Sequence, residues 1–307
     1  MSKIALSVEK LTKIYSGDKK DKSQKALNNL NFEVKQGEVF GLLGPNGAGK
    51  TTFLSILGVV KTEGTVNVWG FDLDKNPRQV KASIGIVPQE INLDAFFTPK
   101  KLLELQAGLY GVKAKDRITD IILKMVALED KANAYSRSLS GGMKRRLLIA
   151  KAMVHQPPIL VLDEPTAGVD VELRKNLWNN VRELNKEGVT IILTTHYLFE
   201  AQEMCDRIAI IDKGNLVALD TTQKLLDRIQ TKKVTFKVEK VNTSKSLSMG
   251  GMNFVIKDGS TISVTYEKNT HKFEEILEFL KKNNLKIIDI VTEDGDLEDV
   301  FIKLTNN

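Results

Sequence analysis

A glycine-rich loop from Gly44 to Thr51 carries the clearest chemistry in this chain of 307 residues. It reads Gly-Pro-Asn-Gly-Ala-Gly-Lys-Thr and fits the pattern G-x-x-x-x-G-K-[ST]. An apolar strand, Val39–Leu43, precedes the loop, and a helix is expected to follow from Thr51 to about Leu57. Glycines let successive backbone amides surround phosphate oxygens, and the start of a helix adds positive potential. The sequence therefore predicts a phosphate-binding loop, with Lys50 on the β and γ phosphates and the Thr51 hydroxyl on Mg²⁺.

Two adjacent carboxylates, Asp163 and Glu164, follow a second apolar strand, Ile159–Leu162. By itself this feature also fits an acidic strand end that caps the next turn. Beside a phosphate loop, the pair favours Asp163 as a Mg²⁺ ligand and Glu164 as the group that orients or deprotonates an attacking water. Together the two segments indicate hydrolysis of a nucleoside triphosphate.

A second candidate phosphate site lies at Leu139-Ser140-Gly141-Gly142-Met143, where a serine and two glycines open a helix. One γ phosphate does not need two such sites from the same chain. We therefore expect a dimer in which the Ser140 loop of each chain faces the phosphate loop of the other. The alternative is a capped helix with a glycine-rich entry and no ligand.

In this combination, residues 1 to about 225 resemble the nucleotide-binding subunit of an ABC transporter, with six motifs in the order of that family. Gly44–Thr51 matches the Walker A motif, Val87–Glu90 the Q-loop, and Leu139–Met143 the signature motif. Ile159–Glu164 matches Walker B, Ala167–Asp170 the D-loop, and Thr194–His196 the switch histidine. The pattern is most similar to bacterial exporter ATPases of the drug- and sodium-extruding class, and to YadG-like members of it.

The resemblance implies ATP as the nucleotide and assigns a role to each matching residue. Glu164, His196, Gln89 and Lys50 are implied in catalysis, and Thr51, Gln89 and Asp163 in holding Mg²⁺. The residues implied in binding ATP are Tyr15 on the adenine, and Gly44, Pro45, Asn46, Gly47, Ala48, Gly49, Lys50, Thr51 and Thr52 around the phosphates. Across the interface of a head-to-tail homodimer, the implied residues are Ser140, Gly141, Gly142 and Asp170.

Some positions depart from the family pattern or have a structural alternative. Met143 stands where the signature usually has Gln, but the phosphate-facing donors are retained, so we expect activity to survive. Tyr15 precedes a long polar loop and fits an ordinary loop tyrosine as the alternative. The run Lys144–Arg146 is expected to be a solvated helix face. His155 and His271 are expected to be structural.

The elements that must position these groups alternate between strand and helix, which favours a parallel sheet with helices on its faces. With the resemblance, they imply an α/β fold: a P-loop NTPase core of the ABC type, with a RecA-like parallel sheet, an antiparallel β subdomain and a helical subdomain at about residues 92–157. We expect this ATP-binding domain over residues 1–228. Residues 229–307 are expected to form a small α+β domain, either a dimer-stabilising or regulatory element or a passive spacer.

Composition narrows the function classes. The single cysteine, Cys205, excludes an intrachain disulfide scaffold. The net charge of +6 lies within the first 230 residues, and it is too mild to argue for nucleic acid. We expect neither a signal peptide nor a spanning helix. The resemblance therefore implies a separate membrane permease and a cytoplasmic location, peripheral on the inner face of the cell membrane. A non-transport ABC ATPase acting on ribosomes or nucleic acid is the alternative.

Overall fold

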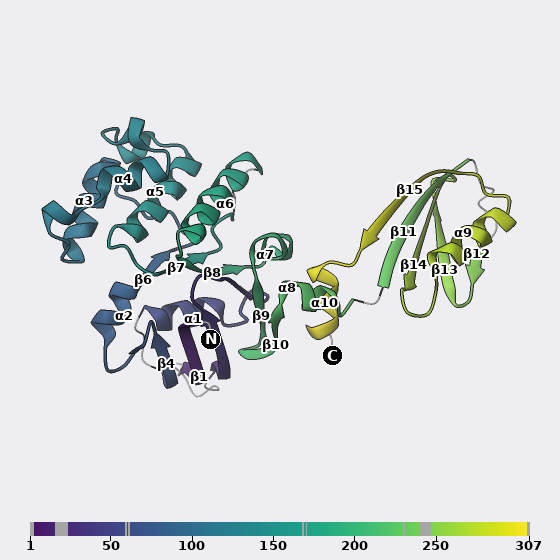
Figure 1. Cartoon of the computed structure of the whole chain (residues 1–307), viewed down its shortest axis with the longest axis horizontal. Helices are drawn as coiled ribbons and strands as arrows, with labels where there is room; N and C mark the ends of the chain where they lie inside the picture. The colour runs from purple at the N-terminus through teal and green to yellow at the C-terminus, as the bar shows by residue number, and fades with distance from the viewer. Residues whose placement is uncertain are drawn as a thin grey trace. The chain divides into compact units, whose positions relative to one another are not determined.

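The structure is a computed structural model that describes residues 3–15, 24–58, 60, 62–167, 169, 171–229, 231–239 and 247–305. The chain divides into two compact units, Met1–Thr222 and Gln223–Asn307 (Figure 1). Within the described part of the chain, no helix combines the length and the apolar character that crossing a membrane requires.

A six-stranded sheet forms the centre of the first unit, with the strand order β10-β9-β3-β8-β7-β6. Its strands are β3 (Val39–Leu43), β6 (Ile84–Val87), β7 (Ile159–Asp163), β8 (Thr190–Thr195), β9 (Arg207–Asp212) and β10 (Asn215–Thr221). All neighbours are parallel except β10, which runs antiparallel to β9. The apolar runs of β3, β7 and β8 are buried because helices or a second sheet cover both faces. Parallel strands end at one edge, so the segments after β3, β7 and β8 meet there.

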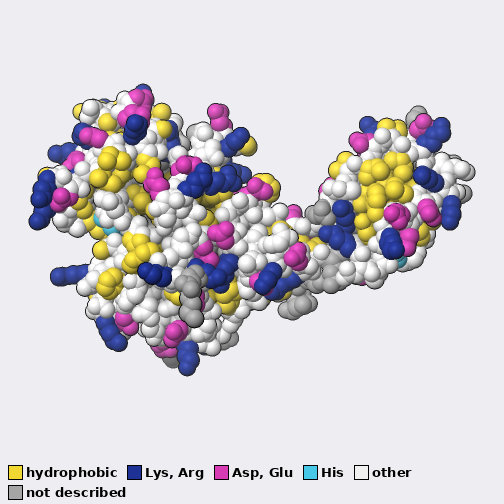
Figure 2. Space-filling view, in the orientation of Figure 1, with side chains coloured by type: hydrophobic (Ala, Val, Ile, Leu, Met, Phe, Trp, Pro, Cys, Tyr) yellow, Lys and Arg dark blue, Asp and Glu magenta, His cyan; other side chains and the backbone are white. Residues whose placement is uncertain are grey.

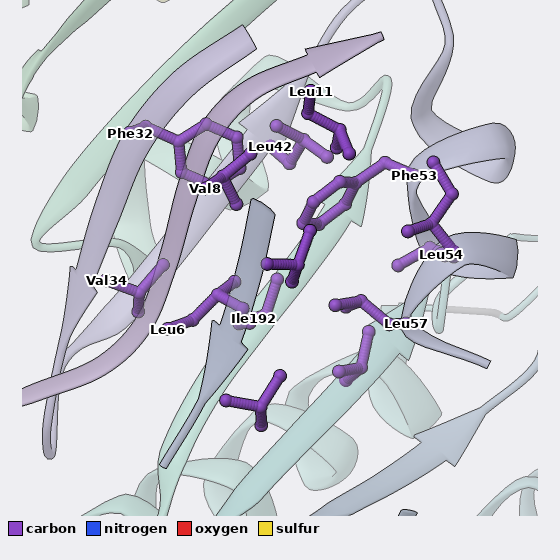
Figure 3. Packing of buried hydrophobic residues seen from close by; sticks show 14 of the residues in the cluster. Leu6, Val8, Leu11, Phe32, Val34, Leu42, Phe53, Leu54, Leu57 and Ile192 are labelled. Atoms are coloured by element: carbon purple, nitrogen blue, oxygen red, sulfur yellow. The ribbon is translucent and has the colours of Figure 1, made fainter. Parts of the chain in front are cut away.

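A four-stranded antiparallel sheet, β2-β1-β4-β5, packs over the first helix. Its strands are β1 (Ile4–Tyr15), β2 (Gln24–Lys35), β4 (Glu63–Val68) and β5 (Phe71–Asp72), and the helix is α1 (Lys50–Leu57). Phe53 of α1 is fully buried, and its ring centroid lies 5.4 Å from that of Phe32 on β2. Figure 3 shows Leu6, Val8, Phe32 and Phe53 around this contact, with Ile192 of the central sheet. Burying a phenylalanine side chain stabilises a fold by about 1.5–3 kcal/mol, so this core fixes α1, and with it the loop that precedes α1.

The first unit also contains six further α-helices among its described residues. They are α2 (Pro77–Ser83), α3 (Pro99–Leu109), α4 (Thr119–Met125), α5 (Gly141–Met153), α6 (Val171–Lys186) and α7 (Leu198–Met204). Helices α3, α4 and α5 pack together as a separate helical layer (Figure 1). Thr98 caps α3 by accepting a hydrogen bond from the Lys101 amide, and Pro99 occupies the first turn, where its missing amide costs nothing.

The second unit begins with α8 (Thr222–Leu226, whose first residue belongs to the first unit) and contains an antiparallel sheet in the order β12-β13-β14-β11-β15. Its strands are β11 (Thr231–Val238), β12 (Leu247–Met249), β13 (Met252–Lys257), β14 (Thr261–Glu267) and β15 (Ile287–Asp294), with helices α9 (Phe273–Lys282) and α10 (Leu297–Thr305). Alternate residues of β11, including Phe236, form a core with Ile276 and Leu280 of α9. Asp258 and Gly259 both have positive φ, which suits a tight turn between β13 and β14.

Candidate active site

The loop after β3 turns back on itself and begins α1. Gly49 has a φ of +112°, and a Cβ at this position would lie 2.6 Å from Leu27 Cδ2 and 2.7 Å from the Ala26 carbonyl oxygen. Only glycine therefore allows the loop to pass so close to β2. Ala48 is buried beneath the loop, and its carbonyl accepts a hydrogen bond from the Gly214 amide at 3.0 Å. The loop is thus held from two sides.

Lys50 lies in the first turn of α1 and is only 6% exposed. Its Nζ donates to the Gly44 carbonyl at 2.6 Å and to the Pro45 carbonyl at 3.2 Å. The same nitrogen lies 4.0 Å from Glu164 Oε1. Burial lowers the pKa of Lys50, while the carboxylates of Glu164 and Asp163 raise it. A buried cation beside a glycine loop and a helix start is a donor set that fits a polyphosphate.

The Glu164 carboxylate contacts two other predicted catalytic side chains, those of Gln89 and His196. Gln89 Nε2 donates to Glu164 Oε2 at 3.1 Å, and His196 Nδ1 lies 3.1 Å from Glu164 Oε1. The Glu164 amide donates to the Thr194 carbonyl at 3.0 Å, which links the end of β7 to β8. Glu164 has a φ of +43°, a left-handed conformation that is uncommon for a residue with a side chain. Strained backbone of this kind is concentrated at functional sites.

Asp163, the preceding residue, is half-buried at the end of β7. Burial raises the pKa of the Asp163 carboxyl, and a hydrogen bond from Thr194 Oγ1 at 2.6 Å opposes that shift. Because Gln89 Nε2 is used on Glu164, Gln89 Oε1 is the amide atom left to approach a metal. Carboxylate, amide and hydroxyl oxygens are ligands that Mg²⁺ accepts. The donor set of Thr51, Gln89 and Asp163 therefore fits that ion.

These groups surround a cleft of about 730 Å³. Of the predicted residues, its walls contain Tyr15, Pro45, Asn46, Gly47, Gly49, Lys50, Thr51, Thr52, Gln89, Glu164 and His196. Tyr15 closes β1 at one end of the cleft and is 46% exposed, and Lys13 Nζ lies 5.3 Å from the centre of its ring. Gly44, Ala48 and Asp163 lie behind the wall, where they support the loop and the strand end.

Comparison with known proteins agrees with this geometry. A profile of the ABC transporter family matches residues 27–167. The linearmycin resistance ATP-binding protein LnrL of Bacillus subtilis (strain 168) is 41% identical over 205 residues, which are 65% of this chain and 66% of that protein. A Nod factor export ATP-binding protein I of Rhizobium sp. (strain N33) is 40% identical over 232 residues, 74% of each chain. The chain belongs to the ABC transporter ATP-binding family.

Solved structures of this family have the same fold. An ATP-binding subunit of an ABC transporter superposes with a TM-score of 0.63 at 28% identity, over 73% of this chain and 92% of that one. The dimeric post-hydrolysis state of the ATP-binding cassette MJ0796, bound to ADP and Pi, gives 0.62 at 27% identity, over 71% and 98%. The fold class expected from the sequence is thereby confirmed, and the chain is an ATP-binding ATPase. About two thirds to three quarters of the length of the curated relatives is matched.

The signature loop of this ABC ATPase does not line the cleft of its own chain. Ser140 caps α5 by accepting a hydrogen bond from the Met143 amide at 3.3 Å, and Ser140 and Gly141 are exposed while Gly142 is buried. The structure therefore separates Ser140, Gly141 and Gly142 from the phosphate loop within one chain. Asp170, the other residue implied at a dimer interface, lies outside the described residues.

The expectation of a solvated face at Lys144–Arg146 is wrong for its two arginines. Arg145 is only 3% exposed and donates to the carbonyls of Pro88 and Gln89. Arg146 is half-buried and donates to the carbonyls of Val126 and Ala127. Both arginines fill carbonyl-rich gaps between segments, which an exposed helix face does not do. Helical spacing contained the signal for Arg145, because Leu148, Ile149 and Ala152 at i+3, i+4 and i+7 are all apolar.

Sequence reasoning also missed four residues in the wall of the cleft: Gln24, Lys25, Ala26 and Lys213. The first three begin β2, and Lys213 lies in the turn between β9 and β10 with a φ of +46°. They reach the cleft because the Gly214 turn packs against both the phosphate loop and β2. No motif marks them, since their place depends on contacts between two different sheets.

Proposed function

We propose that this ABC ATPase powers export through a separate membrane permease, as a head-to-tail homodimer that closes on two ATP molecules. One observation carries the proposal: the cleft holds Lys50, Glu164, Gln89 and His196 together, while the exposed Ser140 loop of the same chain lies outside it. A second copy in head-to-tail orientation would bring its Ser140 loop over the cleft. The similar cassette MJ0796 is dimeric in its ADP- and Pi-bound structure, which supports this arrangement.

In this proposal Glu164 accepts the proton of the attacking water, and its two oxygens are oriented separately. His196 lies on Oε1 and Gln89 on Oε2, and each oxygen retains a lone pair for the water. Lys50 neutralises charge on the phosphates, and His196, held against Glu164, contacts the γ phosphate. Thr51, Gln89 and Asp163 would hold Mg²⁺, which would withdraw charge from the phosphate oxygens when bound. Tyr15 would stack on the adenine.

A groove beside the Gln89 loop supports a permease partner. It measures about 430 Å³ and has apolar walls from Ile84 and Ile86 of β6, Tyr110 after α3, and Leu148 of α5. Ile86 and Tyr110 are more than a third exposed. Figure 2 shows hydrophobic side chains gathered over helices α3 to α5 and between them and α2. An amphipathic helix of the permease is a suitable occupant, because such helices place an apolar face in grooves of this kind.

Lysines frame the same groove and define the chemistry of its partner. Lys81 of α2 and Lys151 of α5 both line it, so the docking helix would carry acidic residues beside its apolar face. In this proposal the protein works at the inner face of the cell membrane, beside its permease. The export direction rests on the linearmycin resistance and Nod factor export proteins among the relatives. The same relatives speak against action on ribosomes or nucleic acid.

The test is to lock a tagged Glu164→Gln chain with ATP and Mg²⁺ in detergent-solubilised membranes and identify what is captured. We expect a polytopic membrane protein, and its loss when Lys81→Glu and Lys151→Glu are added. Lys124→Glu is the matched control, because Lys124 is an exposed lysine of α4 outside the groove. Capture of ribosomal proteins or nucleic acid without a membrane protein would overturn the transport proposal and leave the ATPase activity standing.

A further inference from the structure

Arg145 is a buried cation outside the predicted site. It lies in the second turn of α5, five residues after Ser140. One guanidinium nitrogen, Nη1, donates to the Pro88 carbonyl at 3.0 Å and to the Gln89 carbonyl at 2.8 Å. Its Nε is buried and has no hydrogen-bond partner within the described part of the chain. Burial lowers the pKa of Arg145, and Asp163 is the carboxylate that opposes the shift. Burying a charge this deeply is costly, so a structural reason for it is expected.

The two carbonyls that Arg145 binds belong to Pro88 and Gln89, the first residues of the loop that follows β6, called here the Gln89 loop. Gln89 donates its side-chain amide to Glu164, so the Gln89 backbone decides where that amide reaches. The segment from Gln89 to Ala95 forms neither helix nor strand. A guanidinium that bonds two successive carbonyls fixes the peptide between them more firmly than a single bond does. The Arg145 side chain thus joins α5, the helix that Ser140 caps, to the loop whose Gln89 side chain contacts Glu164.

We propose that Arg145 is a positioning residue for ATP hydrolysis, holding the Pro88–Gln89 backbone so that the Gln89 amide stays on Glu164 and tying this loop to the helix that begins at Ser140. The inference rests on the proposed roles of Gln89 and Glu164. In a head-to-tail dimer, Ser140 meets the nucleotide of the other chain. Arg145 then connects that contact to the hydrolytic group of its own chain.

Arg146 provides a matched control on the same helix. It also donates from Nη1 to two successive carbonyls, those of Val126 at 2.7 Å and Ala127 at 2.8 Å. These carbonyls follow α4 and do not belong to the Gln89 loop. Removing either arginine deletes the same chemistry at nearly the same distances, but only Arg145 reaches the Gln89 loop.

The experiment measures steady-state ATP hydrolysis by the full chain and ATP affinity by calorimetry in a Glu164→Gln background. We expect Arg145→Met to lower kcat by about 10-fold or more with the Kd for ATP changed less than about 3-fold. Arg145→Lys, which retains the charge and several donors, should recover part of the loss. Arg146→Met should lower the thermal midpoint comparably, with kcat within about 3-fold of the wild type.

A double-mutant cycle with Gln89→Ala separates positioning from general destabilisation. If Arg145 acts through Gln89, Arg145→Met should cost less than about 3-fold further once Gln89 is alanine. Equal losses with and without Gln89, or an unchanged kcat in Arg145→Met, would overturn the inference. Arg145→Gln replaces Arg145→Met under the same criteria if the latter does not fold. Wild-type hydrolysis and permease capture test the proposed function separately, so its failure is distinguishable from this one.

Discussion

Replacing Glu164 by glutamine removes one negative charge from the centre of the cleft and changes little else. Glutamate and glutamine have nearly the same shape and both carry a Cβ, so the backbone strain at a φ of +43° is the same for both. A glutamine carbonyl oxygen still accepts from Gln89. What disappears is the group able to take a proton from water, together with the carboxylate 4.0 Å from Lys50 Nζ.

These two losses act on different steps, and their sizes follow from the structure. General base catalysis contributes about 10²–10⁴-fold, so turnover should fall by about 10²-fold or more, equivalent to about 2.7 kcal/mol in the barrier. At 4.0 Å, with an effective dielectric constant of about 20, the attraction between Lys50 and Glu164 is about 4 kcal/mol before desolvation is counted. Removing it leaves Lys50 with the Gly44 and Pro45 carbonyls, and frees it for a phosphate. ATP affinity should therefore be unchanged or tighter.

The assay measures kcat by phosphate release and Kd for ATP by calorimetry, each with Mg²⁺. Glu187→Gln, at an exposed position after α6, is the control for the same chemical change and should match the wild type. Near-normal turnover in Glu164→Gln would remove Glu164 from the base role. A loss of ATP affinity greater than about 10-fold would instead indicate that the Lys50–Glu164 pair holds the cleft open for the nucleotide.

Three further outcomes are expected. Gly49→Ala should lower the free energy of unfolding by about 3 kcal/mol or more, because the new Cβ would meet Leu27 and the Ala26 carbonyl. Gly47→Ala, at a φ of +81° with open space around it, should lower it by only about 1–2 kcal/mol, and denaturant titrations measure both. Burial lowers the pKa of His155 in the folded state, so the unfolded chain binds the proton first as the pH falls below about 6.5. The thermal midpoint should therefore drop between pH 7.5 and 5.5, and the drop should be larger in the wild type than in His155→Phe. A Ser140→Arg chain and a Lys50→Ala chain, each inactive alone, should regain ATPase activity when mixed, because a head-to-tail dimer of the two retains one complete site. A mixture with no activity would count against the head-to-tail dimer.

The sequence predicted the part of the site that follows from strands and the turns after them. Val39–Leu43 and Ile159–Leu162 are short apolar runs bounded by glycine or by charge, a pattern that fits strands buried on both faces. Parallel strands in one sheet must end at the same edge. The meeting of Glu164 with His196 follows from that rule, and the 3.1 Å contact between them agrees with it.

The parts that could not be predicted depend on contacts between separate layers. Lys25 and Lys213 line the cleft because β2 and the β9–β10 turn both pack on the phosphate loop, and spacing along the chain contains no trace of that packing. The short strand β12 was also missed, since Leu247–Met249 is too brief to show alternation. Arg145 is a different case. Its charge suggested solvent, while the apolar positions at i+3 and i+4 placed it on the buried face of α5.

Four charged side chains around the cleft act as a unit: Lys50, Glu164 and Arg145 are buried, and Asp163 is half-buried. Lys50 is coupled to Glu164 and Asp163, and Asp163 is coupled in turn to Arg145. Two cations therefore balance two carboxylates in a region of low dielectric, where an unpaired charge is expensive. Removing Arg145 would leave Asp163 with Lys50 as the nearby cation among the described residues, which would raise the pKa of Asp163 further. In the proposed mechanism Asp163 must be ionised to hold Mg²⁺. We therefore expect Arg145 to act mainly through the Gln89 backbone, and its charge beside Asp163 to account for the loss of less than about 3-fold that remains in the Gln89→Ala background. Arg145→Lys keeps the charge and should show no such remainder in that background.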